Sequence, residues 1–578
     1  MSAGPRQFAA TLAALDDPTL AALFAARRVS PTAPWRDFFD AAEGLTDEAS
    51  LVRALEQLTA DELTALEAAM DPAAARHPAD GHDAAARRLA LMDAEGRPLP
   101  QVQRLLAARA GTASPHASHP ARSAAPAAEG AAAERAFTSV AALGDVIIQA
   151  LHTPLSRIGS GALGAADRRR IADDLTRPED LDTLVALAER AGLLSVEGRV
   201  FLPTPAGEDW LAEGTTRRWA LVARRWSEGL ARGLRTESGW VAPEEWPLAY
   251  PADPAWPELA GALRAQARVW GLVAADDTLP RWMLLMPHDA ESAETALAAL
   301  LPHEVDRIYL QNDLTAISPG PLAAGLDVRL RRMARRESHA QASTYRFTAD
   351  SVAAALTEGE TEPSMLEFLT TLSLTGVPQP LEYLVRTTAE SHGLVRVAEA
   401  PPDSSGASRT VVRSPDAQVL ETIAVDQALR PLGLVRTDDG SALTTRVERN
   451  AVLWALVDAR YPAVAVDADG AIEPLTRHRL AAGPTPHPDP QVAYAPLIAM
   501  LRGADSGDAD AAWMGRELES AVRARGVLEV EVALPGGETR VFTLEATGLG
   551  GGRLRGRERG TDVERTLPVS SIRGIRRH

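Results

Sequence analysis

The chain has 578 residues with no cysteine and no lysine, so all 60 basic residues are arginine, against 78 acidic residues and a net charge of −18. The absence of cysteine excludes disulfides, thiolate nucleophiles and cysteine-ligated zinc, and the absence of lysine excludes a standard P-loop, protein-kinase chemistry and Schiff-base catalysis. The acidic balance opposes indiscriminate adhesion to nucleic acid, so any DNA contact requires local basic patches.

The length of the chain suits about three to five domains, each able to bury its own core. Apolar residues make up 46% of the sequence and aromatic residues only 4%, which favours helices packed through alanine and leucine. We therefore expect a multidomain, mainly α protein with α+β modules. No run of eighteen apolar residues occurs and no signal-peptide pattern follows Met1, so we expect a cytoplasmic protein without a membrane partner.

Residues 1–109 have the apolar spacing of amphipathic helices and are predicted to form a helical domain. Thr59, followed by Asp61 and Glu62, is typical of a capped helix start. Residues 110–135 are rich in alanine, proline and serine and have no aromatic or branched aliphatic side chain, which predicts a flexible linker. His116 and His119 in this linker have a metal-like spacing, but two ligands in a tether do not make a metal site.

Residues 136–235 are predicted to form three helices and then a hairpin, which is the element order of a winged helix. In DNA-binding winged helices the third helix enters the major groove. Here that helix is acidic, with Glu179, Asp180, Asp182 and Glu189 against Arg177 and Arg190, so a role in protein contact or packing is an open alternative. Residues 236–300 repeat the order of helix, glycine turn and hairpin more weakly, and we interpret them as a second winged-helix-like segment.

From residue 301 onward, short strands alternate with helices. A turn at Asn312-Asp313 separates two predicted strands, and Thr348 is expected to cap the helix ADSVAAALTEG. The stretch LTGVPQPLEYLVRTTAESHGLVRV predicts a turn, a helix and a strand, with Gly393 ending the helix. We interpret His392 as a cation that interacts with the helix dipole, because catalysis would require a positioned third group.

The Tyr-Arg-Phe-Thr strand, the Leu-Thr-Gly-Val-Pro turn and the Ser-His-Gly helix end before Val-Arg-Val resemble the N-terminal domain of the XPB/Ssl2 helicases. The sequence is similar, more closely, to actinobacterial helicase-associated proteins that carry this domain without a motor. On this resemblance, residues 301–480 are an XPB N-terminal-like α/β domain. In XPB the domain is an accessory to the motor and docks another subunit of the TFIIH complex, so the resemblance implies a protein-docking role and no catalytic residue.

The C-terminal part is predicted as a linker over 481–512 and a small SH3-like β-barrel over 513–578, whose alternating strands turn at Pro535-Gly536-Gly537. The barrel resembles the WYL domains of bacterial regulators, which bind nucleic acid or small ligands, although the Trp-Tyr-Leu signature is missing. The glycines from Gly548 to Gly552 indicate a hairpin rather than a nucleotide loop, because no helix follows them. The aspartates around 505–510 are interpreted as a solvated linker rather than a two-metal nuclease site.

These patterns favour a non-catalytic, DNA-associated adaptor that works with an XPB-like helicase or nuclease in DNA repair or transcription, without a cofactor or metal. A WYL-type transcriptional regulator that senses a ligand through its barrel is the alternative. A GC-rich genome also produces arginine in place of lysine, so no arginine is functional by its type alone. The predicted DNA contacts are Arg168, Arg169, Arg170, Arg199, Arg329, Arg331, Arg332, Arg335, Arg336, Arg553, Arg555, Arg557, Arg576 and Arg577.

Overall fold

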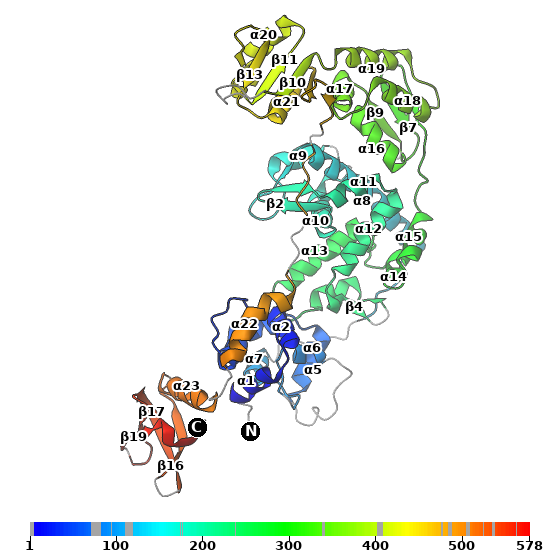
Figure 1. The fold of residues 1–578 in the computed structure, drawn as a ribbon. Helices are drawn as coiled ribbons and strands as arrows, with labels where there is room; N and C mark the ends of the chain where they lie inside the picture. Colours follow the sequence, from blue (N-terminus) through cyan, green and yellow to red (C-terminus); the bar gives the residue numbers. More distant parts are fainter. Residues whose placement is uncertain are drawn as a thin grey trace. The chain divides into compact units, whose positions relative to one another are not determined.

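The computed structural model describes most of the chain, which is coloured from its first to its last residue in Figure 1. The described residues fall into two compact units, each assembled from separate stretches: unit 1 is Met1–Ala117, Pro247–Pro257 and Pro486–His578, and unit 2 is Ser118–Trp246 and Glu258–Thr485. The described ranges are 5–70, 83–93, 95–109, 119–173, 175, 177–236, 239–337, 342–400, 409–475, 478–483, 488–504, 509–523, 525–534, 538–561 and 563–577.

Unit 1 begins with a helical domain, as the apolar spacing predicts. Thr59 and Glu62 form a reciprocal capping box at the start of α5, which confirms the predicted cap. Although α1 and α2 together have the apolar content of a membrane span, they are bent by 119°, and no single helix in the described ranges is long and apolar enough to cross a membrane. The helices are α1 Pro5–Ala14, α2 Asp17–Ala26, α3 Phe38–Thr46, α4 Glu48–Leu55, α5 Ala60–Ala68, α6 Ala84–Arg88 and α7 Pro100–Arg109.

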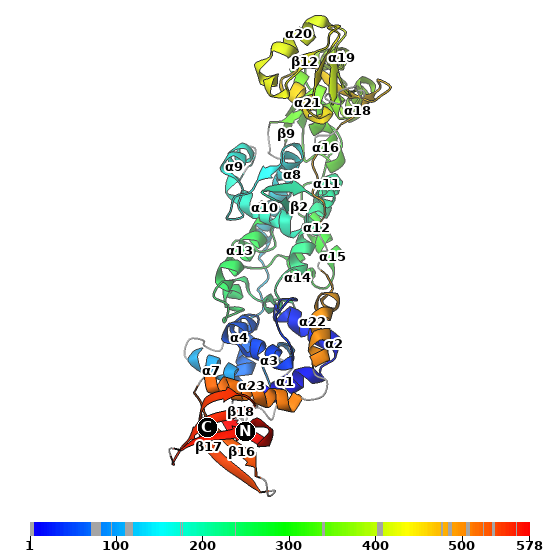
Figure 2. The ribbon, with the colours of Figure 1, turned by 60° about the vertical axis from the view of Figure 1, so that its left-hand side comes forward.

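The predicted linker over 481–512 is wrong over Pro490–Ala504, which forms helix α22 of the helical domain. Figure 2 shows α22 beside α2. Tyr494, Leu497 and Leu501 are buried in the same core as Leu20 and Phe24 of α2. The apolar positions of α22 have helical spacing, but the surrounding prolines indicated a linker, and the face that α22 covers lies more than 460 residues earlier in the chain.

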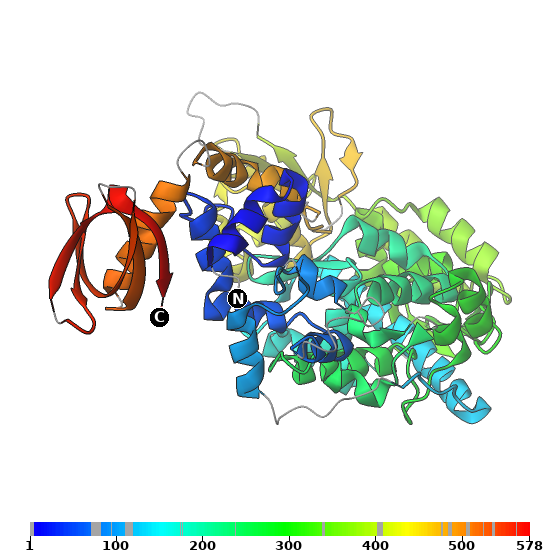
Figure 3. The same cartoon turned by 90° about the horizontal axis from the view of Figure 1, so that it is seen from below.

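The C-terminal residues form a helix, α23 Ala509–Arg523, and an antiparallel five-stranded sheet in the order β19-β18-β17-β16-β20. Leu518 and Ala521 of α23 pack into the core of this sheet with Leu528 and Leu544. Figure 3 shows the sheet curved around that core. The strands are β16 Val527–Ala533, β17 Thr539–Gly550, β18 Arg553–Glu558, β19 Glu564–Pro568 and β20 Ile572–Arg577; the predicted turn at 535–537 and the aspartates at 505 and 508 lie outside the described residues.

Unit 2 opens with α8 Pro126–His152, which begins inside the segment predicted to be a flexible linker. Alanine is the best helix former, and Ala132, Ala133 and Ala136 are buried. The alanine-rich composition that predicted a linker therefore forms the buried side of a helix. The following elements are β1 Leu155–Ser156, α9 Ala165–Ala172, α10 Leu181–Arg190, β2 Leu194–Glu197, β3 Val200–Pro203, α11 Pro205–Ala212 and α12 Thr215–Glu228, and the strands form an antiparallel sheet in the order β1-β3-β2.

The hairpin predicted after Gly271 in residues 236–300 is not present among the described residues. Gly271 (φ +66°) ends α13, and a Cβ there would lie 2.3 Å from the carbonyl oxygen of Ala132. Trp282 donates its Nε1–H to the Gly271 carbonyl oxygen at 2.8 Å, so the apolar residues form a loop and a short helix against α8. The elements here are β4 Arg235–Thr236, β5 Gly239–Trp240, α13 Trp256–Val269, α14 Arg281–Leu285 and α15 Ala290–Ala298.

Residues 305–391 form a module with its own core, built on an antiparallel sheet in the order β6-β7-β9-β8. The predicted turn at 312–313 and the Thr348 cap are both confirmed, the cap as a capping box with Ser351. The elements are β6 Tyr309–Leu310, β7 Thr315–Ser318, α16 Ala324–Met333, β8 Arg335–Arg336, β9 Ser343–Arg346, α17 Ala349–Thr357, α18 Glu362–Leu372 and α19 Gln379–Ser391.

A second module with a separate core follows, so the segment predicted as one domain over 301–480 contains two. Its six strands have the order β12-β13-β11-β10-β14-β15, in which β10 and β14 are parallel. The elements are β10 Val395–Glu399, β11 Thr410–Arg413, α20 Ala417–Val425, β12 Val435–Arg436, β13 Ala442–Thr445, α21 Arg449–Asp458, β14 Ala463–Val466 and β15 Ile472–Glu473. Short 3-10 turns lie at Pro178–Asp180, Arg232–Leu234, Pro243–Leu248, Gln427–Leu432 and Val569–Ser571.

Candidate functional site

A buried carboxylate joins α8 to the first module. The side chain of Asp145 is only 4% exposed. It forms ion pairs with Arg331 of α16 at 2.7 Å and with Arg336 of β8 at 2.5 Å. Tyr345 donates its hydroxyl hydrogen to Asp327 at 2.6 Å. Burial disfavours the charge of Arg331, but Asp145 and Asp327 outweigh this effect and raise its pKa. These groups therefore form a charged junction, which we define as Asp145, Asp327, Arg331, Arg336 and Tyr345.

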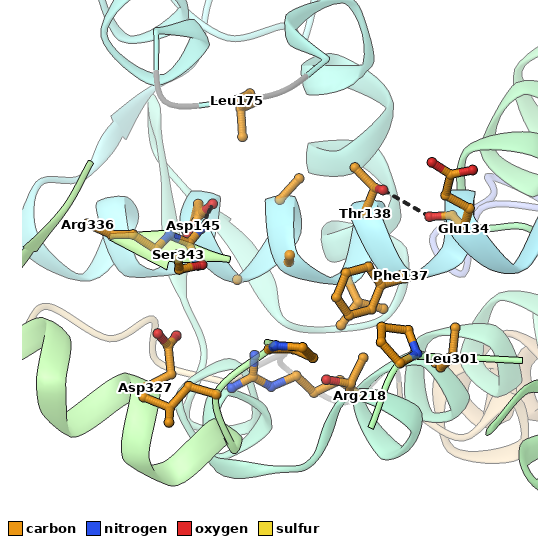
Figure 4. A pocket seen from close by; sticks show the side chains of 18 of the residues that line it. Glu134, Phe137, Thr138, Asp145, Leu175, Arg218, Leu301, Asp327, Arg336 and Ser343 are labelled. Atoms are coloured by element: carbon orange, nitrogen blue, oxygen red, sulfur yellow. Dashed lines mark hydrogen bonds and ion pairs between the residues drawn. The ribbon is translucent and has the colours of Figure 1, made fainter. Parts of the chain in front are cut away.

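The charged junction forms one end of a cavity of about 460 Å³. Figure 4 shows Asp145, Arg336 and Ser343 at one end of this cavity and Glu134 at the other. Phe137, Val140, Leu301, Pro302 and Leu322 provide apolar walls. A concave site with apolar walls and a few convergent polar groups is the usual form of a small-molecule site.

Arg218 of α12 also lines this cavity and is 8% exposed. Its Nε–H donates to the Trp210 carbonyl oxygen at 3.2 Å, and its Nη2 donates to the Leu211 carbonyl oxygen. Both carbonyls lie at the C-terminal end of α11, where a cation is favoured by the helix dipole. Burial lowers the pKa of Arg218. The sequence pattern gave no indication of Arg218, because α12 carries four arginines and its local sequence does not show which of them is buried.

The arginines of α9 and the β2–β3 turn, which the sequence predicts to contact DNA, lie near the surface. Arg168 is paired with Asp182 at 2.5 Å, and Arg170 contacts Asp167 and Gln149 at 2.9 Å. Arg169 and Arg199 are exposed. Local acidic partners therefore neutralise two of these four predicted contacts.

The predicted basic patch at Val328–Arg336 is not an open cationic surface. Arg329 binds Glu360 through Nε and Nη2, at 2.8 and 2.9 Å, and lies over the Phe368 ring. Arg331 and Arg336 belong to the charged junction, with side chains only 14% and 10% exposed. Successive positions of a helix point in different directions and those of a strand alternate between its faces, so Arg332 of α16 and Arg335 of β8 are exposed while Arg331 and Arg336 are mostly buried.

Strand β18 carries three of the five remaining predicted arginines on one face. Arg553, Arg555 and Arg557 are exposed and alternate with the buried Leu554 and Gly556. Opposite Arg553 and Arg555 the neighbouring strands carry only Gly550, Pro568, Gly548 and Thr566, whereas Arg557 lies between Glu545 and Glu564. Arg576 faces Glu529 across β16. The backbone of Arg577 lies in β20, and its side chain lies outside the described set.

His392 does not have the cationic role predicted for it. It lies at the end of α19 before Gly393, as expected, but burial lowers its pKa, and its Nε2 atom is buried without a hydrogen-bond partner. A neutral imidazole therefore packs at this position. Across the described ranges, no group of three or more histidine, aspartate or glutamate side chains is arranged to hold a metal ion.

Residues 308–438 match the family model of the helicase conserved C-terminal domain.

This part of the chain is helicase-related. The match covers less than a quarter of the sequence. It begins just before β6, includes all the helices and strands of the first module, and ends just after β12, before β13 and β14 complete the six-stranded sheet. The charged junction thus links the helicase-matching segment to α8, which lies outside the match. No curated protein matches the chain.

Proposed function

We propose that this protein is a non-catalytic, DNA-associated adaptor that acts with an XPB-like helicase or nuclease in DNA repair or transcription. The helicase-related segment supports a helicase partnership, and its resemblance to the XPB N-terminal domain favours docking to another protein over catalysis. The complete lack of lysine supports a chain without its own P-loop. Such an adaptor holds nucleic acid and a motor together.

The arginine pair Arg553 and Arg555 on β18 carries the DNA-binding part of the proposal. Both side chains are exposed, and within the described ranges neither makes a hydrogen bond or ion pair. Alternate residues of a strand share one face and lie about 7 Å apart. Because glycine, proline and threonine flank them, the two guanidinium groups are not screened by neighbouring acids. Arginine suits phosphate through its planar fork of donors.

The element order of α8, β1, α9, α10, β2 and β3 supports a winged helix in unit 2. In this module Arg199 is exposed at the turn of the hairpin, where the wing of a DNA-binding winged helix contacts backbone phosphates. Helix α10 carries Asp182, which pairs with Arg168, so this helix is a poor candidate for the major groove. Phosphate contact through the wing and protein contact through α10 are the roles that these charges favour.

The proposal is tested by measuring binding of the purified chain to duplex, forked and single-stranded DNA at two salt concentrations, with an ATPase assay in parallel. We expect DNA binding that weakens as salt rises, because phosphate contacts release counterions, and no ATP turnover. ATP hydrolysis by the pure protein would overturn the non-catalytic role. A footprint confined to one operator sequence would instead favour a ligand-sensing transcriptional regulator.

A further inference from the structure

The cavity beside the charged junction has the apolar walls and the few polar groups of a small-molecule site. Its volume of about 460 Å³ lies in the range of small-molecule pockets, about 300–1,000 Å³. Gly130, Glu134 and Leu300 line it and are exposed, so a ligand reaches it from solvent at that end. Phe137 lies between the charged junction and this end, and Leu301 lies toward the Glu134 end (Figure 4).

Arg218 supplies hydrogen-bond donors that the protein does not use. A guanidinium group has five N–H donors, and those of Arg218 that have protein acceptors go to the carbonyl oxygens of Trp210 and Leu211. For the others, the described part of the chain provides no acceptor. Nη1 lies against α8, where a Cβ on Gly144 would be 3.6 Å away. The group points toward the side of the cavity where Asp327 lies (Figure 4).

At this end of the cavity, the cationic side chains outnumber the anionic side chains by one. Three arginines, Arg218, Arg331 and Arg336, line it with two aspartates, Asp145 and Asp327. Both aspartates are engaged within the charged junction, and Arg218 has no carboxylate within 4 Å among the described residues. Glu134 lies at the opposite end, and Glu304, which accepts a hydrogen bond from the Thr215 backbone and whose charge acts on Arg218, does not line the cavity.

We propose that this pocket binds a small organic monocarboxylate, with its carboxylate against Arg218 and its apolar body along Phe137 and Leu301. A single carboxylate matches the unused donors of Arg218 through a charge-assisted, forked contact. The apolar walls favour a hydrocarbon body over a hydrated inorganic anion.

The proposal is tested by saturation-transfer NMR and thermal shift on the full chain with hexanoate, hexanamide and inorganic phosphate as probes. Hexanoate is expected to give a saturable NMR signal and a rise in melting temperature. Neither hexanamide nor phosphate is expected to reproduce these effects at the same concentration. Equal responses to hexanoate and hexanamide, an equal response to phosphate, or no saturable hexanoate signal would overturn it.

Substitutions in and near the cavity test whether hexanoate binds there. Arg218→Gln should abolish the hexanoate response, but it also removes contacts to α11. Ala141→Leu fills the cavity from α8 and leaves Arg218 in place, so it should lower hexanoate affinity at least tenfold. Ala131→Leu adds the same group at an exposed position of α8 and should leave affinity unchanged. Unaltered hexanoate binding by Ala141→Leu would show that the ligand binds elsewhere and would contradict the proposal.

Discussion

At the scale of single residues, Asp145 has a structural role that the sequence did not indicate. It lies on the mainly apolar buried side of α8 and contacts two arginines that come 186 and 191 residues later in the chain. A buried ion pair is weak evidence for net stability, but removing one partner leaves buried charge without compensation. Its replacement therefore tests whether the junction holds the helicase-matching segment to α8.

We expect Asp145→Asn to lower the free energy of unfolding of unit 2 by about 3–5 kcal/mol, the range for breaking a buried pair. Urea unfolding of the full chain, followed by far-UV circular dichroism, measures the change. Asp182→Asn is the matched control, because it breaks the half-exposed pair with Arg168 and surface pairs contribute about 0–1 kcal/mol. Equal effects of the two substitutions would show that the junction is not a structural link.

His392 predicts a pH dependence of stability. Burial lowers its pKa below the ordinary value of 6.5, so the unfolded state binds a proton at a higher pH than the folded state does. Its contribution to stability is therefore complete above pH 6.5 and is lost as the pH falls below that value. Melting temperatures of the wild type should fall more between pH 7.5 and pH 5 than those of His392→Gln.

His288→Gln, which removes an exposed imidazole, is the control for that comparison and should follow the wild type. A His392→Gln variant with the same pH profile as the wild type would contradict the burial of a neutral imidazole at the end of α19.

At the scale of elements, the sequence predicted the features that depend on residues close together in the chain. The Thr59 and Thr348 caps and the turn at 312–313 follow from side chains within a few residues of each other, and all were predictable. Helix α22 and the first part of α8, residues 126–135, were missed because proline-rich and alanine-rich composition indicated linkers, while their burial depends on distant partners. For the same reason the sequence identified arginines but not which of them lie opposite Asp145 or Glu360.

The contact between α13 and α8 predicts an unequal effect of two glycine substitutions. Gly271→Ala should lower the melting temperature of unit 2, because its Cβ would lie 2.3 Å from a carbonyl oxygen at φ +66°; strain of this kind costs about 1–3 kcal/mol. Gly261→Ala lies inside α13 with nothing within 4 Å of the added atom. It should raise stability by about 0.5–1 kcal/mol, as alanine does in helix interiors. Differential scanning calorimetry compares the two, and a stabilising Gly271→Ala would contradict the close approach.

At the scale of the whole molecule, the first and last parts of the chain belong to one unit. Tyr494 of α22 donates its hydroxyl hydrogen to the Val29 carbonyl oxygen at 2.6 Å, and Arg502 donates to the carbonyl oxygens of Ala13 and Leu15. The helical domain therefore depends on residues that follow the helicase-matching segment. This chain path places the first and last described segments in one compact unit.

We expect a fragment that ends at residue 485 to lose the fold of residues 1–109, because removal of α22 exposes the core face of α2. Limited proteolysis should cleave rapidly within 1–109 of this fragment while the residues of unit 2, 118–246 and 258–485, remain protected. The fragment 118–485 provides the control and should keep its own melting transition. Protection of residues 1–109 in the absence of α22 would contradict this dependence.

The most direct test of the adaptor proposal is the salt dependence of DNA binding by Arg553→Gln/Arg555→Gln, measured by fluorescence anisotropy on single-stranded and duplex DNA. Loss of two phosphate contacts should weaken binding on all sequences and reduce the slope of log affinity against log salt by about 2. Arg53→Gln/Arg104→Gln changes the net charge equally at exposed arginines of the helical domain and should leave the slope unchanged. Equal slopes for the wild type and both variants would contradict a DNA-contacting role for β18.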